Sequence, residues 1–262
     1  MIRTLTTAGA GMVAQQTNLD TIANNLANVN TTGYKALRAE FQDMVYQTFR
    51  ASGALADTST SAPAALQVGL GSRFSANSVS AANGPMQATG NSLDLALQGE
   101  GFFQVQRQDG TAAYTRDGSF KRDANGLLVT GDGYHMLPEI TIPAGATALA
   151  ISPTGQISAI LPGQNEPQQL GQITIATFTN PAGLTRIGQN LFVAGGASGD
   201  PRIGNPGENG SGTVQSGFLE GSNVQVVEEM VHMITAQRAY EINSKAIQTA
   251  DEMLNVINNL KR

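Results

Sequence analysis

Both ends of this chain carry apolar residues at seven-residue intervals, and the sequence between them does not. Near the N-terminus the interval joins Leu5, Met12, Leu19 and Leu26. Near the C-terminus it joins Val226, Met233, Tyr240, Ile247 and Leu254, with Met230 and Ile257 beside them. A repeat of this period places apolar side chains along one face of a long helix that packs lengthwise on another helix. The pattern predicts paired, coiled-coil-like terminal helices in an α+β chain, an arrangement suited to stacking subunits.

The first 33 residues are almost uncharged, since only Arg3 and Asp20 carry a charge. A solvated amphipathic helix normally has a charged face opposite its apolar stripe. We therefore expect protein to cover this helix on several sides, with the amides of Asn24, Asn25 and Asn28 hydrogen-bonded in a dry contact. The alternative is a surface helix whose polar residues are simply solvated. The helix is predicted to end at Gly33, because glycine readily adopts the left-handed conformation that terminates helices.

Four segments follow from pattern and composition. The predicted divisions are an N-terminal helix of an inner core domain (1–33), a short helix and an extended linking arm (34–72), a central β domain (73–212), and a return segment with the C-terminal helix of the core domain (213–262). The short helix is expected over 34–49, and the C-terminal helix is expected to start at Ser222 or Asn223 as N-cap, with Gln225 in a capping box.

The centre of the sequence has the turn signals of antiparallel β-structure. Asx-Gly pairs end at Gly110, Gly118, Gly126 and Gly133, and short apolar runs separate them. Asx-Gly supplies a positive φ at little steric cost, and this spacing is typical of consecutive hairpins. The central domain is therefore predicted to be mainly antiparallel β.

The sequence offers little for catalysis or ligand binding. The net charge of −5 argues against nucleic-acid binding, and the absence of Cys excludes disulfides and thiolate metal sites. His135 and His232 are isolated, and the Asp-Gly turns lack the acidic spacing of a calcium loop. We expect no enzyme activity, no cofactor, no metal and no transmembrane span. No cleaved secretion signal is expected either.

The two apolar stripes bury too little surface on their own to offset the entropy of ordering two long helices. We therefore expect the terminal helices to be largely disordered in the monomer. They would become ordered when neighbouring subunits cover their remaining faces, which makes assembly and folding of the ends a single event.

Four stretches of the sequence together resemble bacterial flagellar rod and hook proteins. NLDTIANNLANVNTTGYKALRAEF is similar to their N-terminal signature, and EEMVHMITAQRAYEINSKAIQTADEMLNVINNL is similar to their C-terminal helix. NSLDLALQGEGFFQV and AYTRDGSFKRDANGLLVTGDGY are similar to motifs of their central β domain. The length and the arm sequence most resemble the distal-rod branch of the family, and a proximal-rod paralogue is the alternative within it.

The resemblance implies a structural subunit of the flagellar basal body that polymerises helically into a hollow tube. The paired terminal helices would line the channel, and the rod would transmit motor torque through the periplasm to the hook. Implied partners are further copies of the chain, proximal rod proteins, the hook protein, and the rings in the peptidoglycan layer and outer membrane. Export would use the flagellar type III apparatus without a cleaved signal peptide.

The expected functional residues are therefore assembly contacts between or within subunits. They are Leu5, Met12, Leu19, Ile22, Asn24, Asn25, Leu26, Asn28, Met230, Met233, Tyr240, Ile247 and Leu254. An alternative of a different class is a β-rich binding module on a helical oligomerisation stalk, which an exposed aromatic cluster would favour. A secreted hydrolase is a third alternative.

Overall fold

A computed structural model describes residues 2–51, 55–57, 60–61, 64–143, 145–146, 148–162, 166–208 and 210–259. The chain falls into two compact units, each of which is described by itself. Unit 1 comprises Met1–Leu26, Leu37–Ser78 and Gln225–Arg262, and unit 2 comprises Ala27–Ala36 and Val79–Val224. Residues 52–54, 58–59 and 62–63 of the predicted arm and 260–262 of the predicted C-terminal helix lie outside the described residues.

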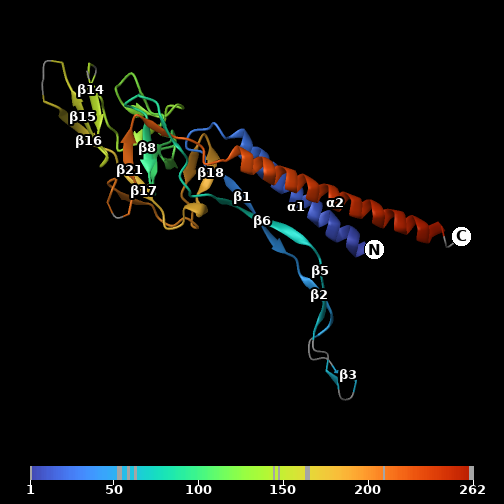
Figure 1. Ribbon diagram of the computed structural model, residues 1–262. Helices are drawn as coiled ribbons and strands as arrows, with labels where there is room; N and C mark the ends of the chain where they lie inside the picture. The colour runs from blue at the N-terminus through green and yellow to red at the C-terminus, as the bar shows by residue number, and fades with distance from the viewer. Residues whose placement is uncertain are drawn as a thin grey trace. The chain divides into compact units, whose positions relative to one another are not determined.

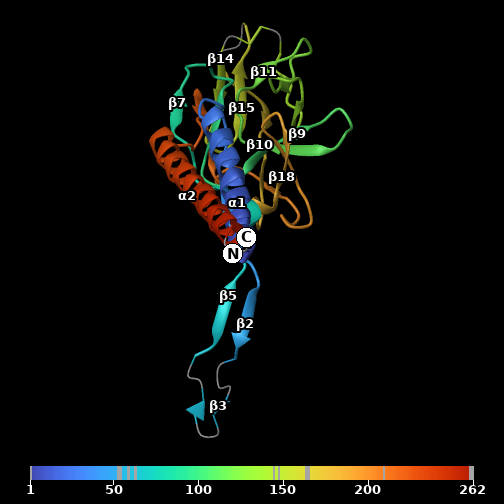
Figure 2. The same ribbon diagram turned by 90° about the vertical axis from the view of Figure 1, so that its right-hand side faces the viewer.

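Unit 1 contains two long helices and a set of paired strands (Figure 1). Its elements are α1 (Ile2–Ala27), β1 (Leu37–Asp43), β2 (Tyr46–Arg50), β3 (Leu55–Asp57), β4 (Thr60–Ser61), β5 (Leu66–Gly69), β6 (Ser72–Val79, whose last residue belongs to unit 2) and α2 (Val226–Asn259). The two helices run side by side in opposite directions (Figures 1 and 2). The α+β class and the two terminal helices are as predicted from the sequence. Coiled-coil packing between the helices stays a prediction.

The two helix boundaries next to unit 2 differ from the predicted ones. α1 ends at Ala27 and not at Gly33, although Gly33 does have a positive φ of 65°. Gly33 is required there for another reason, because a Cβ on it would lie 2.5 Å from the backbone carbonyl carbon of Arg116. α2 begins at Val226, so neither Ser222 nor Asn223 is its N-cap. The Ser222 hydroxyl accepts from the Val224 amide over 3.3 Å, and the Asn223 side chain bonds to other segments, which local spacing does not reveal.

The predicted short helix over 34–49 is wrong. The structure has β1 and β2 there, with β1 paired to β6 and β2 paired antiparallel to β5. Apolar residues at Leu37, Phe41 and Met44 fit a helical period, but aromatic and β-branched residues also favour strands. An edge-to-face contact between Phe41 and Phe74, with ring centroids 6.1 Å apart, joins this stretch to β6. Tertiary pairing therefore overrides the local period.

Unit 2 is an antiparallel β structure. Its strands are β7 (Met86–Ala88), β8 (Leu95–Gln98), β9 (Phe102–Gln106), β10 (Ala112–Thr115), β11 (Lys121–Arg122), β12 (Leu128–Val129), β13 (His135–Leu137), β14 (Ala148–Ile151), β15 (Gln156–Ile160), β16 (Gln168–Gln172), β17 (Ile175–Thr177), β18 (Thr185–Gly188), β19 (Leu191–Val193), β20 (Arg202–Gly204), β21 (Thr213–Ser216) and β22 (Phe218–Glu220), with a 3₁₀ turn at Pro181–Gly183. A nine-stranded sheet has the order β11-β12-β13-β9-β10-β19-β18, with β17 pairing both β9 and β20. A second sheet has the order β14-β15-β16, while β21 pairs with β8 and β22 with β7.

Three of the four Asx-Gly pairs form the predicted hairpin turns. Gly110, Gly126 and Gly133 have positive φ and connect paired strands. Gly118 does not, because β10 and β11 are not partners in the sheet. A Cβ on Gly118 would lie 1.5 Å from the carbonyl oxygen of Leu95, so glycine serves a close backbone approach at this position.

The core of unit 2 lies on both faces of the strands around β9. Successive residues of a strand point to opposite faces, and Phe103 joins a large aliphatic cluster with Val105, while Phe102 joins an aromatic one. The aromatic cluster contains Phe102, Tyr114, Phe178 and Phe192, whose rings make edge-to-face contacts with centroids 4.8–5.8 Å apart. The two clusters together form the hydrophobic core of unit 2.

Candidate assembly surface

The predicted contact residues of α1 lie at different depths in unit 1. Ile22 and Asn25 are buried, Leu5, Met12, Leu19 and Leu26 are half-buried, and Asn24 is exposed. Asn28, which is half-buried, belongs to unit 2 because it follows the end of α1. Whether these residues contact a second copy stays a prediction.

The residues of α2 that face α1 do recur every seven positions, but they are not the residues of the predicted apolar repeat. The line that faces α1 contains Glu229, Ala236, Asn243 and Ala250, of which Ala236 and Ala250 are each only 3% exposed. The predicted residues flank this line: Met233, Ile247 and Leu254 are half-buried, whereas Met230 and Tyr240 are exposed. Small and polar residues at the inner line allow close approach, which leaves the larger apolar side chains at its sides.

One polar contact and one close approach fix the register of the helices. The Asn25 amide nitrogen donates to the Glu229 carboxylate over 3.1 Å and to the Leu37 carbonyl over 2.8 Å. Its oxygen accepts from the Leu37 amide over 2.8 Å, and the residue is 1% exposed. Further along, the backbone of Gly11 approaches Asn243 so closely that a Cβ would lie 3.0 Å from its amide nitrogen. The Asn25 side chain is thus hydrogen-bonded within the chain, and its role in an assembly contact stays a prediction.

The first turns of α2 carry a second apolar face, of which the sequence analysis identified only Met230. Val227, Met230, Val231 and Ile234 are between 51% and 77% exposed. They follow the spacing i, i+3, i+4, i+7, which marks one side of a helix and lies away from the inner line. The signal was present in the sequence, but the seven-residue repeat alone selects only one side. We call these four residues the open face of α2.

The ribbon formed by β2 and β5 also exposes large apolar side chains. Tyr46, Phe49, Leu66 and Val68 are all exposed, as is Val45 directly before β2. The guanidinium of Arg3 lies over the ring of Phe49, 4.8 Å from its centroid, so the ring contacts a cation of its own unit. An exposed apolar ribbon of this kind is typical of surfaces that other protein covers.

Unit 2 contains a buried ionic cluster that the sequence analysis did not find. The Lys35 ammonium donates to the Glu220 carboxylate over 2.6 Å, and an Arg116 guanidinium nitrogen lies 3.3 Å from its other oxygen. The three side chains are at most 4% exposed. Burial lowers the pKa of Lys35, and neighbouring Arg116 lowers it further, while Glu220 raises it. Since 185 residues separate Lys35 from Glu220, no local pattern links them.

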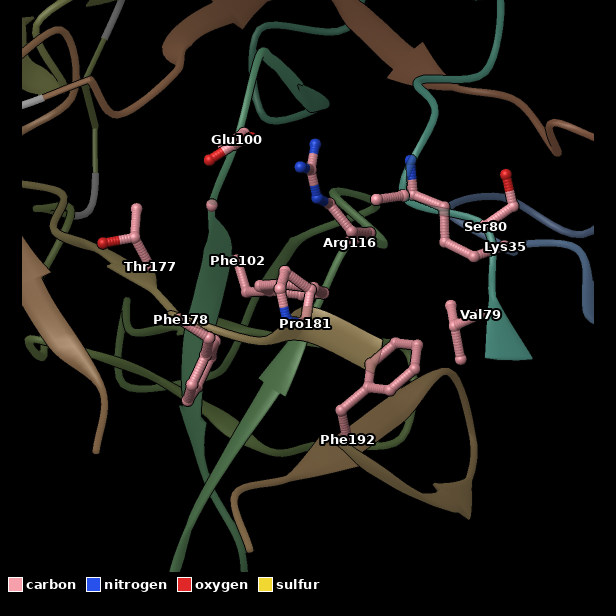
Figure 3. A pocket seen from close by; sticks show the side chains of 12 residues that line it. Lys35, Val79, Ser80, Glu100, Phe102, Arg116, Thr177, Phe178, Pro181 and Phe192 are labelled. Carbon is pink, nitrogen blue, oxygen red and sulfur yellow. The ribbon is translucent and has the colours of Figure 1, made fainter. Parts of the chain in front are cut away.

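A small cavity lies beside this cluster. Lys35, Glu100 and Arg116 lie along one side of it, and the rings of Phe102, Phe178 and Phe192 lie along the other (Figure 3). Burial lowers the pKa of the Arg116 guanidinium, which lies 5.3 Å from the centroid of Phe102. The cavity volume is about 40 Å³, far below the several hundred Å³ typical of ligand pockets.

The structure gives no metal centre within the described residues, where no three His, Cys, Asp or Glu side chains are grouped to hold an ion. His232 is exposed on α2, and His135 is half-buried on β13. Among the helices described, none has the length and apolarity needed to cross a bilayer.

Three family descriptions match successive parts of the chain. "Flagella basal body rod protein" matches residues 5–35, "Flagellar hook protein FlgE/F/G D1 domain" matches 96–159, and "Flagellar basal body rod FlgEFG protein C-terminal" matches 215–260. These ranges contain most of α1, the strands around β9 and all of α2, which build the contact between the helices and the core of unit 2.

Several full-length relatives share one name. Flagellar basal-body rod protein FlgG of Borreliella burgdorferi is 52% identical, with all of both chains covered. FlgG of Agrobacterium fabrum is 48% identical, covering 99% of this chain and 100% of its own. FlgG of Bacillus subtilis is 45% identical over the whole of both chains.

Proposed function

Since the chain belongs to the flagellar basal-body rod protein family and is a structural subunit of the distal rod, we propose that it polymerises helically into a hollow tube. The observation that carries the proposal is the open face of α2. Four large apolar side chains on the side of α2 away from its inner line are unfavourable in water unless other protein covers them. A second copy of the chain is the partner that a tube supplies at every position.

We further propose that α1 and α2 form a coiled-coil-like pair in the wall of the channel. The hydrogen bond from Asn25 to Glu229 supports this, because it joins α1 to α2 at one register. The pair is proposed to be ordered only after neighbouring subunits cover it. Hydrogen exchange on the monomer tests this point, and strong protection across 5–29 and 226–257 would contradict it.

The remaining partners are proposed from the family. They are proximal rod proteins, the hook protein, the rings in the peptidoglycan layer and outer membrane, and the flagellar type III export apparatus. The proposed location is the periplasmic rod, reached without a cleaved signal peptide. We propose no catalytic role, since the family is structural.

The exposed β2–β5 ribbon is proposed to brace each subunit against the next and so to stiffen the tube. Its apolar side chains provide the contact surface. If the arm over 50–72 is shortened, the persistence length of the rods should fall in electron micrographs. Rods that remain as stiff as those of the parent would argue against this role.

The experiment that tests polymerisation replaces Ile234 with Asp on the open face. The matched control is Gln237→Asp, an exposed polar position of the same helix. Both variants introduce Asp into the same helix, so they share its effect on helix propensity. Only Ile234→Asp places the charge on the open face. Sedimentation and electron microscopy should show polymers for the parent and the control and monomers for Ile234→Asp. Equal polymerisation of both variants would refute the contact.

A further inference from the structure

The chain passes between the two units four times, at 26/27, 36/37, 78/79 and 224/225. On the unit 2 side, the residues beside the last three crossings are hydrogen-bonded to one another. We infer that Asn223 ties these three boundary segments into one cooperative unit. We call Asn223 and the segments 33–36, 80–84 and 220–224 the exit clamp.

Asn223 is hydrogen-bonded to both of the other segments of the clamp, 33–36 and 80–84. Its side-chain oxygen accepts from the Ala36 amide over 2.6 Å, and its side-chain nitrogen donates to the Ala82 carbonyl over 2.9 Å and to that of Ser80 over 3.4 Å. Its backbone amide donates to the Tyr34 carbonyl over 3.3 Å, and the Ser80 amide donates to the Ala36 carbonyl over 2.9 Å. One side chain therefore joins two segments to a third.

Glu220 adds a second set of bonds to the same segments. Its carboxylate accepts from the Lys35 ammonium over 2.6 Å, from the Gly84 amide over 2.9 Å and from Arg116 over 3.3 Å. Its backbone carbonyl accepts from the Gly33 amide over 2.8 Å. Each segment of the clamp is thus held by a side chain of residues 220–224.

These bonds replace a sheet. The three segments of the clamp contain almost no strand residues, the last residue of β22 being the exception. In irregular backbone, buried amides and carbonyls need side-chain partners. If one shared partner is removed, the hydrogen bonds that remain hold the three segments less firmly. The segments are therefore expected to open together, as one cooperative unit.

The role of the clamp rests on the proposed function. In a rod, force enters unit 2 through the segments that connect it to the helices and the ribbon. Linked segments share such force, whereas independent ones would detach one at a time. The clamp itself is a property of the single chain and can be tested without polymerisation.

The test is amide hydrogen exchange on the full-length monomer with Asn223→Ala. The Ala36 amide loses its acceptor, so its exchange must become faster in any case. Cooperativity predicts that the amides of Ser80 and Gly33, which Asn223 does not accept from, also exchange at least about tenfold faster, equivalent to about 1.4 kcal/mol. Amides in β9 and β10 should keep their rates. A change confined to Ala36 would overturn the inference.

Two further variants complete the experiment. Asn180→Ala is the control, because this exposed amide of unit 2 makes a single carbonyl bond, to Ala197 over 3.0 Å. It should leave the clamp amides unchanged. If Asn223→Ala does not fold, Asn223→Asp keeps an acceptor for Ala36 and replaces the donor with a carboxylate oxygen, which faces the Ser80 and Ala82 carbonyls without a proton to share. It should still accelerate exchange at Ser80 and Gly33, and parent rates there would also overturn the inference.

Discussion

Replacing Glu220 with Gln measures how strongly unit 2 depends on its buried ionic cluster. Gln has nearly the same shape, so the change leaves no cavity. It removes the charge and replaces one of the two acceptor oxygens with an NH2 donor. Lys35 and Arg116 then remain buried without a counter-ion, at side-chain exposures of 3% and 4%. Removal of one partner from a buried ion pair costs about 3–5 kcal/mol. We expect a loss of this size in the free energy of unfolding of unit 2.

Urea unfolding of the full chain, followed by circular dichroism, provides the measurement, with an unchanged m-value as the check that only stability has altered. Glu241→Gln is the matched control, because Glu241 pairs with Arg238 at the surface of α2 and exposed pairs contribute about 0–1 kcal/mol. Adding Lys35→Met to Glu220→Gln should recover part of the loss, since one unpaired cation is then absent. A loss below about 1 kcal/mol for Glu220→Gln would refute the reasoning.

The remaining predictions concern strain, pH and assembly. Gly33→Ala should destabilise unit 2 more in urea unfolding than Gly90→Ala, because both have positive φ but only the new Cβ of Gly33 meets backbone, at 2.5 Å; equal losses would contradict this. The pKa of Lys35 is lowered in the folded state, so between that pKa and the ordinary lysine value of 10.5 the unfolded chain binds more protons than the folded chain. The contribution of Lys35 therefore makes the free energy of unfolding rise with pH in this range. Lys35→Met should remove this rise, and an unchanged pH slope would count against it. Leu26→Asp and Ile247→Asp should block polymerisation in a sedimentation assay and leave the β signal of unit 2 intact, whereas normal rods would exclude both residues from the interface.

The family and the class of fold are readable in local sequence. The terminal seven-residue repeats specify two long helices because a helix presents every third or fourth residue on one side. The Asx-Gly pairs at Gly110, Gly126 and Gly133 specify hairpins because a positive φ is cheap at glycine, whatever lies elsewhere in the chain. These signals depend only on residues close together in the chain, so no tertiary information is needed to interpret them.

Contacts between distant segments were decided by the tertiary structure alone. Apolar spacing over 34–49 suits either a helix or a strand, and pairing with β5 and β6 selects the strand. Asn223 is of a residue type that often caps helices, yet its side chain bonds to Ala36, 187 positions away in the sequence. The inner line of α2 differs in phase from the apolar repeat because close approach favours Ala236 over larger side chains. Local sequence patterns show which residues recur at regular intervals. Which distant residues come into contact depends on how the whole chain packs, so only the tertiary structure determines it.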